Sequence, residues 1–240
     1  MARYLQQIIV PEIGLLGQEK IKLAKVLIIG AGGLGTPVAT YLAAAGIGTI
    51  GMIDNDVISE SNLQRQFLYS PSEVGLKKVD VLKYKLAHQN PDIQIETFPF
   101  FIDESNATEI ISKFDIVCDC TDNVNARILI DAVCPQHNKP LVYAAVRDWQ
   151  AYITVLHHKN KIQLSNIFSI SDLQNEAQNN CSIAGIVNTT CGVAGSLQAT
   201  EVLKIILGLE SILDGEILCV NTLYSVFRKF KIRIATKDFK

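Results

Sequence analysis

Charge of either sign is scarce in this sequence. Charged residues make up 19% of its 240 positions, and the formal net charge is −2. A nucleic-acid-binding domain usually carries a basic patch or stripe, so this composition disfavours that class. The N-terminus also lacks the basic segment and apolar core of a secretory signal peptide.

Cysteine pairs with metal-binding spacing are missing as well. The six cysteines include no Cys-x-x-Cys pair. The chain is neither short nor rich in cysteine, as disulfide-stabilised secreted domains are. We therefore expect a cytoplasmic protein with reduced thiols.

One long segment contains no charge at all. It runs for 28 residues, from Val26 to Ile53, which is long enough to suggest a membrane helix. Seven glycines interrupt it, and it divides into a β-branched run, a Gly-rich turn, an Ala-rich run and a second β-branched run. A buried strand–helix–strand unit explains it better, because strands covered on both faces are continuously apolar.

Short apolar strands alternate with helices along most of the chain. The pattern predicts strands at 25–29, 49–53, 93–98, 115–119 and 141–145, and helices at 34–45, 76–88 and 124–134, with a weaker helix between residues 98 and 115. Residues 2–24 are expected to be helical with a break near 11–14, and 55–72 to be a polar loop. This alternation indicates an α/β fold with a mainly parallel sheet and helices on both faces.

The C-terminal part has a different pattern. We expect a strand at 152–157, a helix at 190–207, and strands at 216–220 and 225–232 that extend the sheet in antiparallel fashion. The polar stretch 160–180 has no pattern, and so long a segment in a compact domain often serves function. We expect one domain, made of N-terminal helices (1–24), a βαβ core (25–150) and an extension (151–240).

A glycine-rich turn lies between the first predicted strand and helix. Gly30, Gly32, Gly33 and Gly35 would let the backbone approach phosphates, and the helix N-terminus supplies free N–H groups. Asp54 ends the next strand, where an acid can accept hydrogen bonds from ribose hydroxyls. The core is therefore predicted to bind an adenine nucleotide. NAD would satisfy this motif as well as ATP, and a turn without a ligand is the bland alternative.

Two cations and two acids follow this motif. Arg65 and Lys78 suit a triphosphate whose leaving group gains charge, although most such side chains are solvated surface charges. Asp119 and Asp122 follow a strand whose carboxyl end should face a ligand, and carboxylates beside phosphates are typical Mg²⁺ ligands. The alternative is that Asp122 or Asn123 only caps the next helix.

Together these motifs resemble the signature of the ThiF/MoeB/HesA family of ubiquitin-activating-like adenylyltransferases. The resemblance runs in order from about residue 3 to 231, and it rests on Arg3-Tyr4, Gly30–Gly35, 61–66, Lys78, 120–123, 181–185 and 195–199. It implies a Rossmann-like homodimer that uses ATP and Mg²⁺ to adenylate the C-terminal Gly-Gly carboxylate of a ubiquitin-like sulfur-carrier protein. Pyrophosphate leaves, and a sulfur donor of cysteine desulfurase or rhodanese type then gives a thiocarboxylate.

The resemblance also implies roles for individual residues. Asp54 would hold the ribose, and Asp122 would bind Mg²⁺. The other implied nucleotide contacts come from Asp56, Asn62, Arg65 and Lys78. Cys181 stands where some relatives carry a cysteine that bonds covalently to the carrier, an inert thiol being the alternative. Residues from about 158 to 186 would form a loop crossing over the carrier's tail.

The sequence departs from the family pattern in two places. Relatives usually carry two Cys-x-x-Cys pairs that hold a structural zinc, but the first position here reads His157-His158-Lys159-Asn160-Lys161 and no second pair follows. We therefore expect no structural zinc, with His157 and His158 at the surface. The second arginine of the N-terminal Arg-Tyr-x-Arg-Gln motif is Gln6 here, and Arg3 is a candidate substitute on the same helix face.

Three hypotheses about function remain. Within the adenylyltransferase class, Cys181 slightly favours a thiamine-type carrier over a molybdopterin-synthase-type carrier. A nicotinamide-dependent oxidoreductase would use the glycine turn and Asp54, but would leave Arg65, Lys78 and Asp122 without a purpose. The third hypothesis, suggested by Gln6 and the missing cysteine pairs, is a carrier-binding module without activity.

Overall fold

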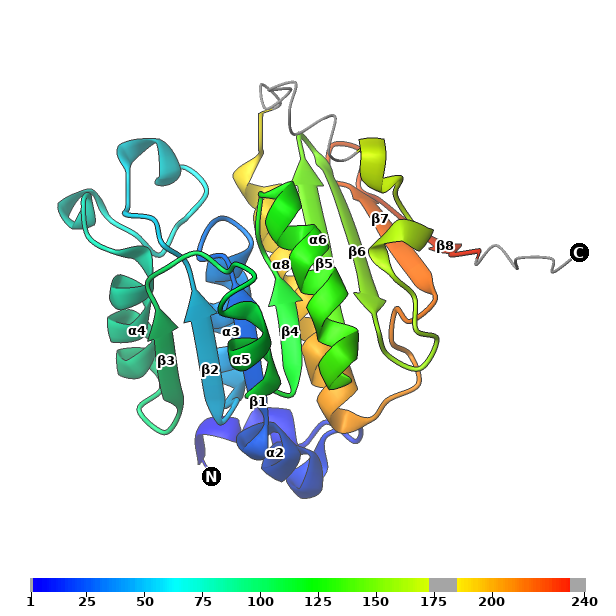
Figure 1. The fold of residues 1–240 in the computed structure, drawn as a ribbon. Coiled ribbons are helices and arrows are strands. Elements are labelled where there is room, and N and C mark those ends of the chain that lie inside the picture. Colours follow the sequence, from blue (N-terminus) through cyan, green and yellow to red (C-terminus); the bar gives the residue numbers. More distant parts are fainter. Residues whose placement is uncertain (1, 173–184, 234–240) are drawn as a thin grey trace, which may run out of the picture.

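One sheet of eight strands organises the chain, with the order β3-β2-β1-β4-β5-β6-β7-β8 (Figure 1). The computed structural model describes residues 2–172 and 185–233. The strands are β1 (Lys25–Ile29), β2 (Thr49–Ile53), β3 (Gln94–Phe98), β4 (Ile116–Asp119), β5 (Leu141–Arg147), β6 (Gln150–Leu156), β7 (Glu216–Asn221) and β8 (Val226–Lys231). The first five are parallel to one another, and β6, β7 and β8 continue the sheet in antiparallel fashion. The predicted fold class is confirmed.

Helices cover both faces of this sheet. Their bounds are α1 (Leu5–Ile8), α2 (Gly14–Leu23), α3 (Gly35–Ala45), α4 (Lys78–Gln89), α5 (Ala107–Ser112), α6 (Val124–Val133) and α8 (Asn188–Leu207). In Figure 1, α5 and α6 lie in front of the sheet while α3 and α8 lie behind it. Each face therefore has its own hydrophobic core, and the parallel strands are buried between the two.

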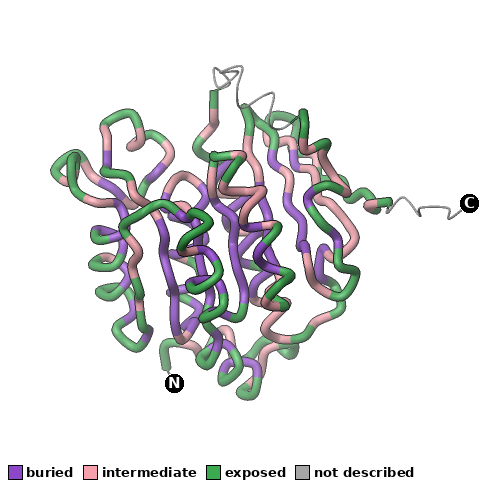
Figure 2. Tube along the Cα trace, viewed as in Figure 1, coloured by how far each residue is buried: buried purple, intermediate pink, exposed green. Residues whose placement is uncertain are grey.

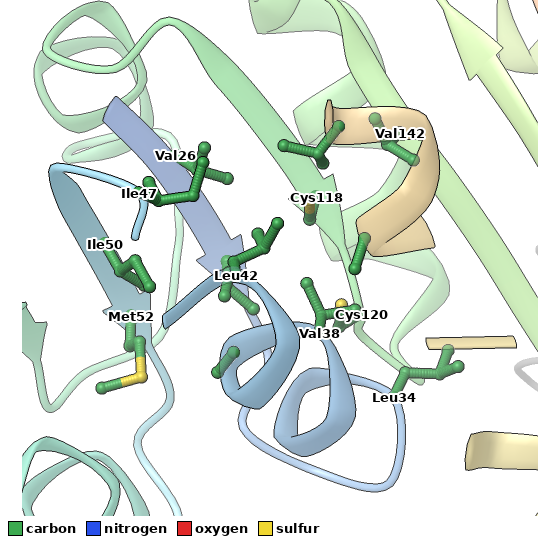
Figure 3. Close-up of a cluster of buried hydrophobic side chains, with 14 of the residues drawn as sticks. Val26, Leu34, Val38, Leu42, Ile47, Ile50, Met52, Cys118, Cys120 and Val142 are labelled. Carbon is green, nitrogen blue, oxygen red and sulfur yellow. The ribbon is translucent and has the colours of Figure 1, made fainter. Parts of the chain in front are cut away.

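The alternation of side chains along β1 explains this division. Val26 and Ile28 belong to the core shared with α3 and α8, whereas Leu27 and Ile29 belong to the core shared with α5 and α6. Successive strand residues point to opposite faces, so a strand covered on both sides must be apolar throughout. Figure 2 shows these central strands as buried along their length, and Figure 3 shows Val38 of α3 within the first core.

The predicted elements are found with small shifts at their ends, and one local prediction is wrong. Strand β6 ends at Leu156, and His157 has a left-handed backbone with φ of 55°. The His157 side chain is only 3% exposed, and its Nε2 lies 2.7 Å from Asp131 Oδ1 of α6. His157 is thus not the surface residue that was expected. The Asp131 carboxylate offsets the cost of burying its polar ring.

Two further observations concern the chain as described. In residues 2–172 and 185–233, no helix has the length and apolar character needed to cross a bilayer. The cysteines in these residues, Cys118, Cys120, Cys134, Cys191 and Cys219, are free thiols. Cys181 and much of the predicted crossing loop lie outside the described residues.

Candidate functional site

A cavity of about 350 Å³ opens at the carboxyl ends of β1, β2 and β4. Its volume falls within the range of small-molecule sites. The strand order reverses direction between β1 and β4, and ligands of open parallel sheets bind at such a switch point. Ile53 and the segment Phe100–Ile102 supply apolar side chains to its wall, while the polar groups come from the glycine turn and the loops after β2 and β4.

The glycine turn forms one wall of this cavity, and its tight path requires glycine at two positions. Gly30 has φ of 100°, a conformation that favours glycine. A Cβ at Gly35, the first residue of α3, would lie 1.9 Å from the carbonyl oxygen of Gly30. Gly32 and Gly33 line the cavity between them. The turn thus brings backbone and a helix N-terminus to the cavity, as phosphate binding requires.

Asp54 fixes the turn to the end of β2. Its Oδ2 accepts a hydrogen bond of 2.7 Å from the Ala31 amide, and its Oδ1 accepts one of 2.8 Å from the Asp56 amide. Asp54 also lines the cavity. Each carboxylate oxygen has a second lone pair, so this side chain can hold the loop and still accept hydrogen bonds from a ligand.

Two cations face the same cavity from separate loops. Lys78 is the first residue of α4 and is only 4% exposed. Its Nζ lies 2.7 Å from Oδ2 of Asp56, whose side chain is 56% exposed. Arg65 packs its side chain beside Gly33 and donates a 3.1 Å hydrogen bond from Nη1 to the carbonyl oxygen of Ser61. Both cations are therefore held in place, and both reach the cavity wall.

The turn after β4 separates the two predicted acids. Asp122 lines the cavity, whereas Asp119 is fully buried and is not part of the cavity wall. Burial raises the pKa of the Asp119 carboxyl, although Arg127 and hydrogen bonds from Thr121 oppose this shift. Asn123 caps α6 by accepting a 3.1 Å hydrogen bond from the Ala126 amide. Of the two predicted acids, only Asp122 is thus placed to face a ligand.

Comparison with known proteins agrees with this architecture. The family model described as "ThiF family" matches residues 4–238. The chain belongs to the ThiF family. It is 40% identical over 230 residues to a probable molybdopterin-synthase adenylyltransferase of Porphyra purpurea, covering 96% of this chain and 60% of that protein. It is 41% identical over 233 residues to the adenylyltransferase and sulfurtransferase MOCS3 of Culex quinquefasciatus, covering 97% of this chain and 53% of that protein.

Solved structures show the same fold. E. coli MccB with ATP is 25% identical, with a TM-score of 0.82, over 93% of this chain and 67% of that one. E. coli MccB with AMPCPP and MccA is 26% identical, with a TM-score of 0.81, over 91% and 66%. The chain spans only about 53% to 60% of the two curated relatives above. Neither relative is named for thiamine synthesis, so the slight preference for a thiamine-type carrier gains no support.

Some residues that the family resemblance singled out do not lie on the cavity wall. The Asn62 side chain belongs to a short 3₁₀ helix, where its Oδ1 accepts a 3.4 Å hydrogen bond from the Ser59 amide. Arg3 donates a 2.8 Å hydrogen bond to the carbonyl oxygen of Gln89, at the C-terminal end of α4. Gln6 is exposed on α1. Neither Arg3 nor Gln6 of this chain lines the cavity.

Other cavity residues were not assigned there by sequence reasoning. Cys191 lines the cavity beside Gly33, and burial raises the pKa of its thiol to about 11 against the opposing effect of Arg65. Gln66 is 3% exposed, and its Oε1 has no hydrogen-bond partner within the described residues. Arg127 reaches the cavity from α6. Its only signal in the sequence was its place four residues after Asn123, on the first turn of a helix that leaves the site.

Proposed function

We propose that this chain binds ATP in the cavity and transfers AMP to the C-terminal carboxylate of a ubiquitin-like sulfur-carrier protein ending in Gly-Gly. The products are an acyl-adenylate and pyrophosphate. The observation that carries this proposal is the pair of held cations, Arg65 and Lys78, which line one cavity together with the glycine turn. A dinucleotide site needs few such cations, because backbone amides and a helix N-terminus bind its single pyrophosphate.

Each group then has a defined part in the reaction. Amides of the glycine turn and the α3 N-terminus bind phosphate oxygens, and Asp54 accepts hydrogen bonds from the ribose. Arg65 and Lys78 stabilise the charge that moves onto pyrophosphate as the carrier's carboxylate attacks the α-phosphorus. The carboxylate is already a nucleophile, so the site must supply position and charge rather than a general base.

Asp122 is the residue that would hold Mg²⁺. The fit is chemically reasonable, since Mg²⁺ is usually bound by one or two carboxylates together with substrate phosphates. The described residues contain no group of three or more His, Cys, Asp or Glu side chains able to hold a metal without such a ligand. When bound, Mg²⁺ neutralises phosphate charge. Asp122 would orient that charge from the short turn between β4 and α6.

The carrier is proposed to be of the molybdopterin-synthase type, as the names of the two curated relatives suggest. The extension 151–240 offers a surface for it, since a hollow on the antiparallel part of the sheet is lined by Tyr152, Tyr224, Val226 and Phe230. Tyr224 is 72% exposed and Phe230 52%. Exposed aromatic side chains of this kind favour a protein partner. The later sulfur donor is proposed to be a separate protein.

A homodimer is part of the same proposal. Large apolar side chains are exposed on the N-terminal helices, among them Leu5 at 52%, Ile9 at 64%, Leu16 at 82% and Leu23 at 77%. Several exposed apolar side chains on one short part of the chain favour a protein interface. Sedimentation at micromolar concentration should give twice the monomer mass, and a monomeric species would contradict the dimer.

Carrier-dependent ATP–pyrophosphate exchange is the decisive test of the activity. Purified protein should catalyse exchange with a molybdopterin-synthase-type carrier in the presence of Mg²⁺, and not with the same carrier shortened by its last glycine. Tight ATP binding without exchange for any Gly-Gly-tailed carrier would favour the inactive module and reject adenylation. Tight NADH binding without ATP binding would favour the oxidoreductase hypothesis instead.

A further inference from the structure

Arg127 occupies an unusual position for a cation in this protein. It lies in the first turn of α6, its side chain is 12% exposed, and it forms part of the cavity wall. Neither the glycine turn nor the two phosphate-facing cations contacts it through a hydrogen bond or ion pair within the described residues. Its partners lie instead on the turn after β4 and on β5.

The Arg127 guanidinium binds the turn that carries Asp122. Nη2 donates a 2.5 Å hydrogen bond to the carbonyl oxygen of Thr121, the residue directly before Asp122. Nε lies 3.9 Å from Oδ2 of Asp119, which stands just before the turn. Arg127 thus contacts both the entry to the turn and its middle, so its position sets the direction in which Asp122 leaves the sheet.

The two carboxylate oxygens of Asp119 have different partners. Its Oδ1 accepts hydrogen bonds from the amide and the hydroxyl of Thr121, at 2.9 and 2.8 Å. Its Oδ2 is buried and has no hydrogen-bond partner among the described residues, so Arg127 is the cation that compensates it. Burial acts to lower the pKa of Arg127, but Tyr143 and Asp119 outweigh it and raise that pKa. Arg127 therefore keeps its positive charge beside Asp119.

The other side of the guanidinium binds β5. Nη1 donates a 2.6 Å hydrogen bond to the Tyr143 hydroxyl, and Nη2 also donates to the carbonyl oxygen of Ala144 at 3.3 Å. The Tyr143 ring lies 6.0 Å from the ring of Phe168, measured between centroids, in the described part of the segment that follows β6. Arg127 therefore joins the Asp122 turn to β5, which also contributes Val146 to the cavity wall.

We propose that Arg127 is a positioning residue for Asp122, and hence for Mg²⁺ on the nucleotide phosphates. This inference rests on the proposed function. Only arginine suits the position, because its planar group donates in three fixed directions at once, to the turn, to Asp119 and to Tyr143. Lysine would keep the charge and lose this geometry.

The test compares Arg127→Lys with the wild type in two measurements. In the first, ATP affinity is measured by calorimetry without carrier, with and without Mg²⁺. We expect the variant to bind ATP without Mg²⁺ as the wild type does, and to lose the gain in affinity that Mg²⁺ gives. In the second, exchange at saturating ATP and Mg²⁺ should fall about 100-fold in kcat, as expected when a reacting group is displaced by about 1 Å.

Two further variants keep the result interpretable. Tyr143→Phe removes one partner of the guanidinium and should lower exchange about tenfold, the scale of one hydrogen bond to a charged group. Asn125→Ala, at an exposed position of the same helix, should match the wild type. If Arg127→Lys unfolds, Tyr143→Phe decides by the same two measurements.

The possible outcomes separate the two proposals. A wild type that neither binds ATP nor exchanges pyrophosphate contradicts the proposed function. An active wild type with an Arg127→Lys variant whose Mg²⁺ dependence and kcat lie within about twofold of it contradicts the positioning role alone. Equal losses of ATP affinity with and without Mg²⁺ would also overturn it, because they would indicate a general structural effect.

Discussion

Replacing Lys78 by methionine should remove most of the activity while leaving the fold intact. The Lys78 stem is buried at 4% exposure, so methionine fills its space while removing the charge. Asp56 loses its partner, but its side chain is 56% exposed and water can solvate it. The free energy of unfolding should therefore fall by no more than about 1 kcal/mol, the scale of an exposed ion pair.

The effect on catalysis should be much larger. Loss of one preorganised charge-stabilising group typically costs about 3–4 kcal/mol, or about 10²–10³ in rate. Lys78 is such a group, because α4 and the hydrogen bond of 3.1 Å from its amide to the Asp56 carbonyl oxygen fix its backbone beside the cavity. We expect ATP–pyrophosphate exchange to fall by that factor at saturating carrier.

The assay needs a control for the loss of a lysine as such. Lys83 is exposed on the same helix, so Lys83→Met should leave exchange unchanged. Thermal unfolding of both variants separates stability from activity. An exchange rate for Lys78→Met within about twofold of the wild type would refute the phosphate role of Lys78 and weaken the case for a triphosphate.

Three other substitutions or treatments test separate features. Gly35→Ala should destabilise the fold by about 3 kcal/mol or more, since its Cβ would lie 1.9 Å from the Gly30 carbonyl oxygen; a melting temperature equal to the wild type would contradict this. Alkylation of Cys191, followed by peptide mapping, should be slow at pH 8 and accelerate as the pH rises to the thiol pKa of about 11. ATP should block this labelling, and labelling that ATP does not affect would place the nucleotide elsewhere. His157→Ala should lower the free energy of unfolding by about 1–3 kcal/mol, because Asp131 Oδ1 loses its 2.7 Å partner; an unchanged stability would reject this. Elemental analysis of the wild type should find no zinc, and one zinc per chain would reject that expectation.

The mainly parallel sheet and its alternation with helices followed from local patterns. Continuous apolar runs such as Lys25–Ile29 and Thr49–Ile53 indicate strands covered on both faces. The helices between them make right-handed crossovers the natural connection. The glycine turn with Asp54 was predictable for the same reason, because strand, turn, helix and acid are close in sequence and only one arrangement brings them together.

The parts that sequence reasoning missed depend on contacts between distant segments. His157 is buried because Asp131, on a helix 26 positions earlier, lies within hydrogen-bond distance. Nothing in the local pattern around His157 indicates that partner. For Asn62 the family resemblance implies a phosphate contact; in the fold its Oδ1 accepts a hydrogen bond from the Ser59 amide, and the phosphate contact stays a prediction.

Helix α8 shows most clearly why the site needed the structure. Its many apolar positions predict a helix packed against the core, and nothing local distinguishes Gln198 from the other polar residues within it. In the fold, Gln198 Nε2 donates to the carbonyl oxygens of Asp119 at 2.9 Å and of Val142 at 3.2 Å. Gln198 approaches from the α8 face of the sheet, whereas Arg127 binds the turn after β4 from the α6 face. Seven residues earlier on the helix, about two turns, Cys191 reaches the glycine turn. Helix α8 therefore contacts both the glycine turn and the end of β4. Because one rigid helix contacts both, the cavity between them can keep a fixed shape.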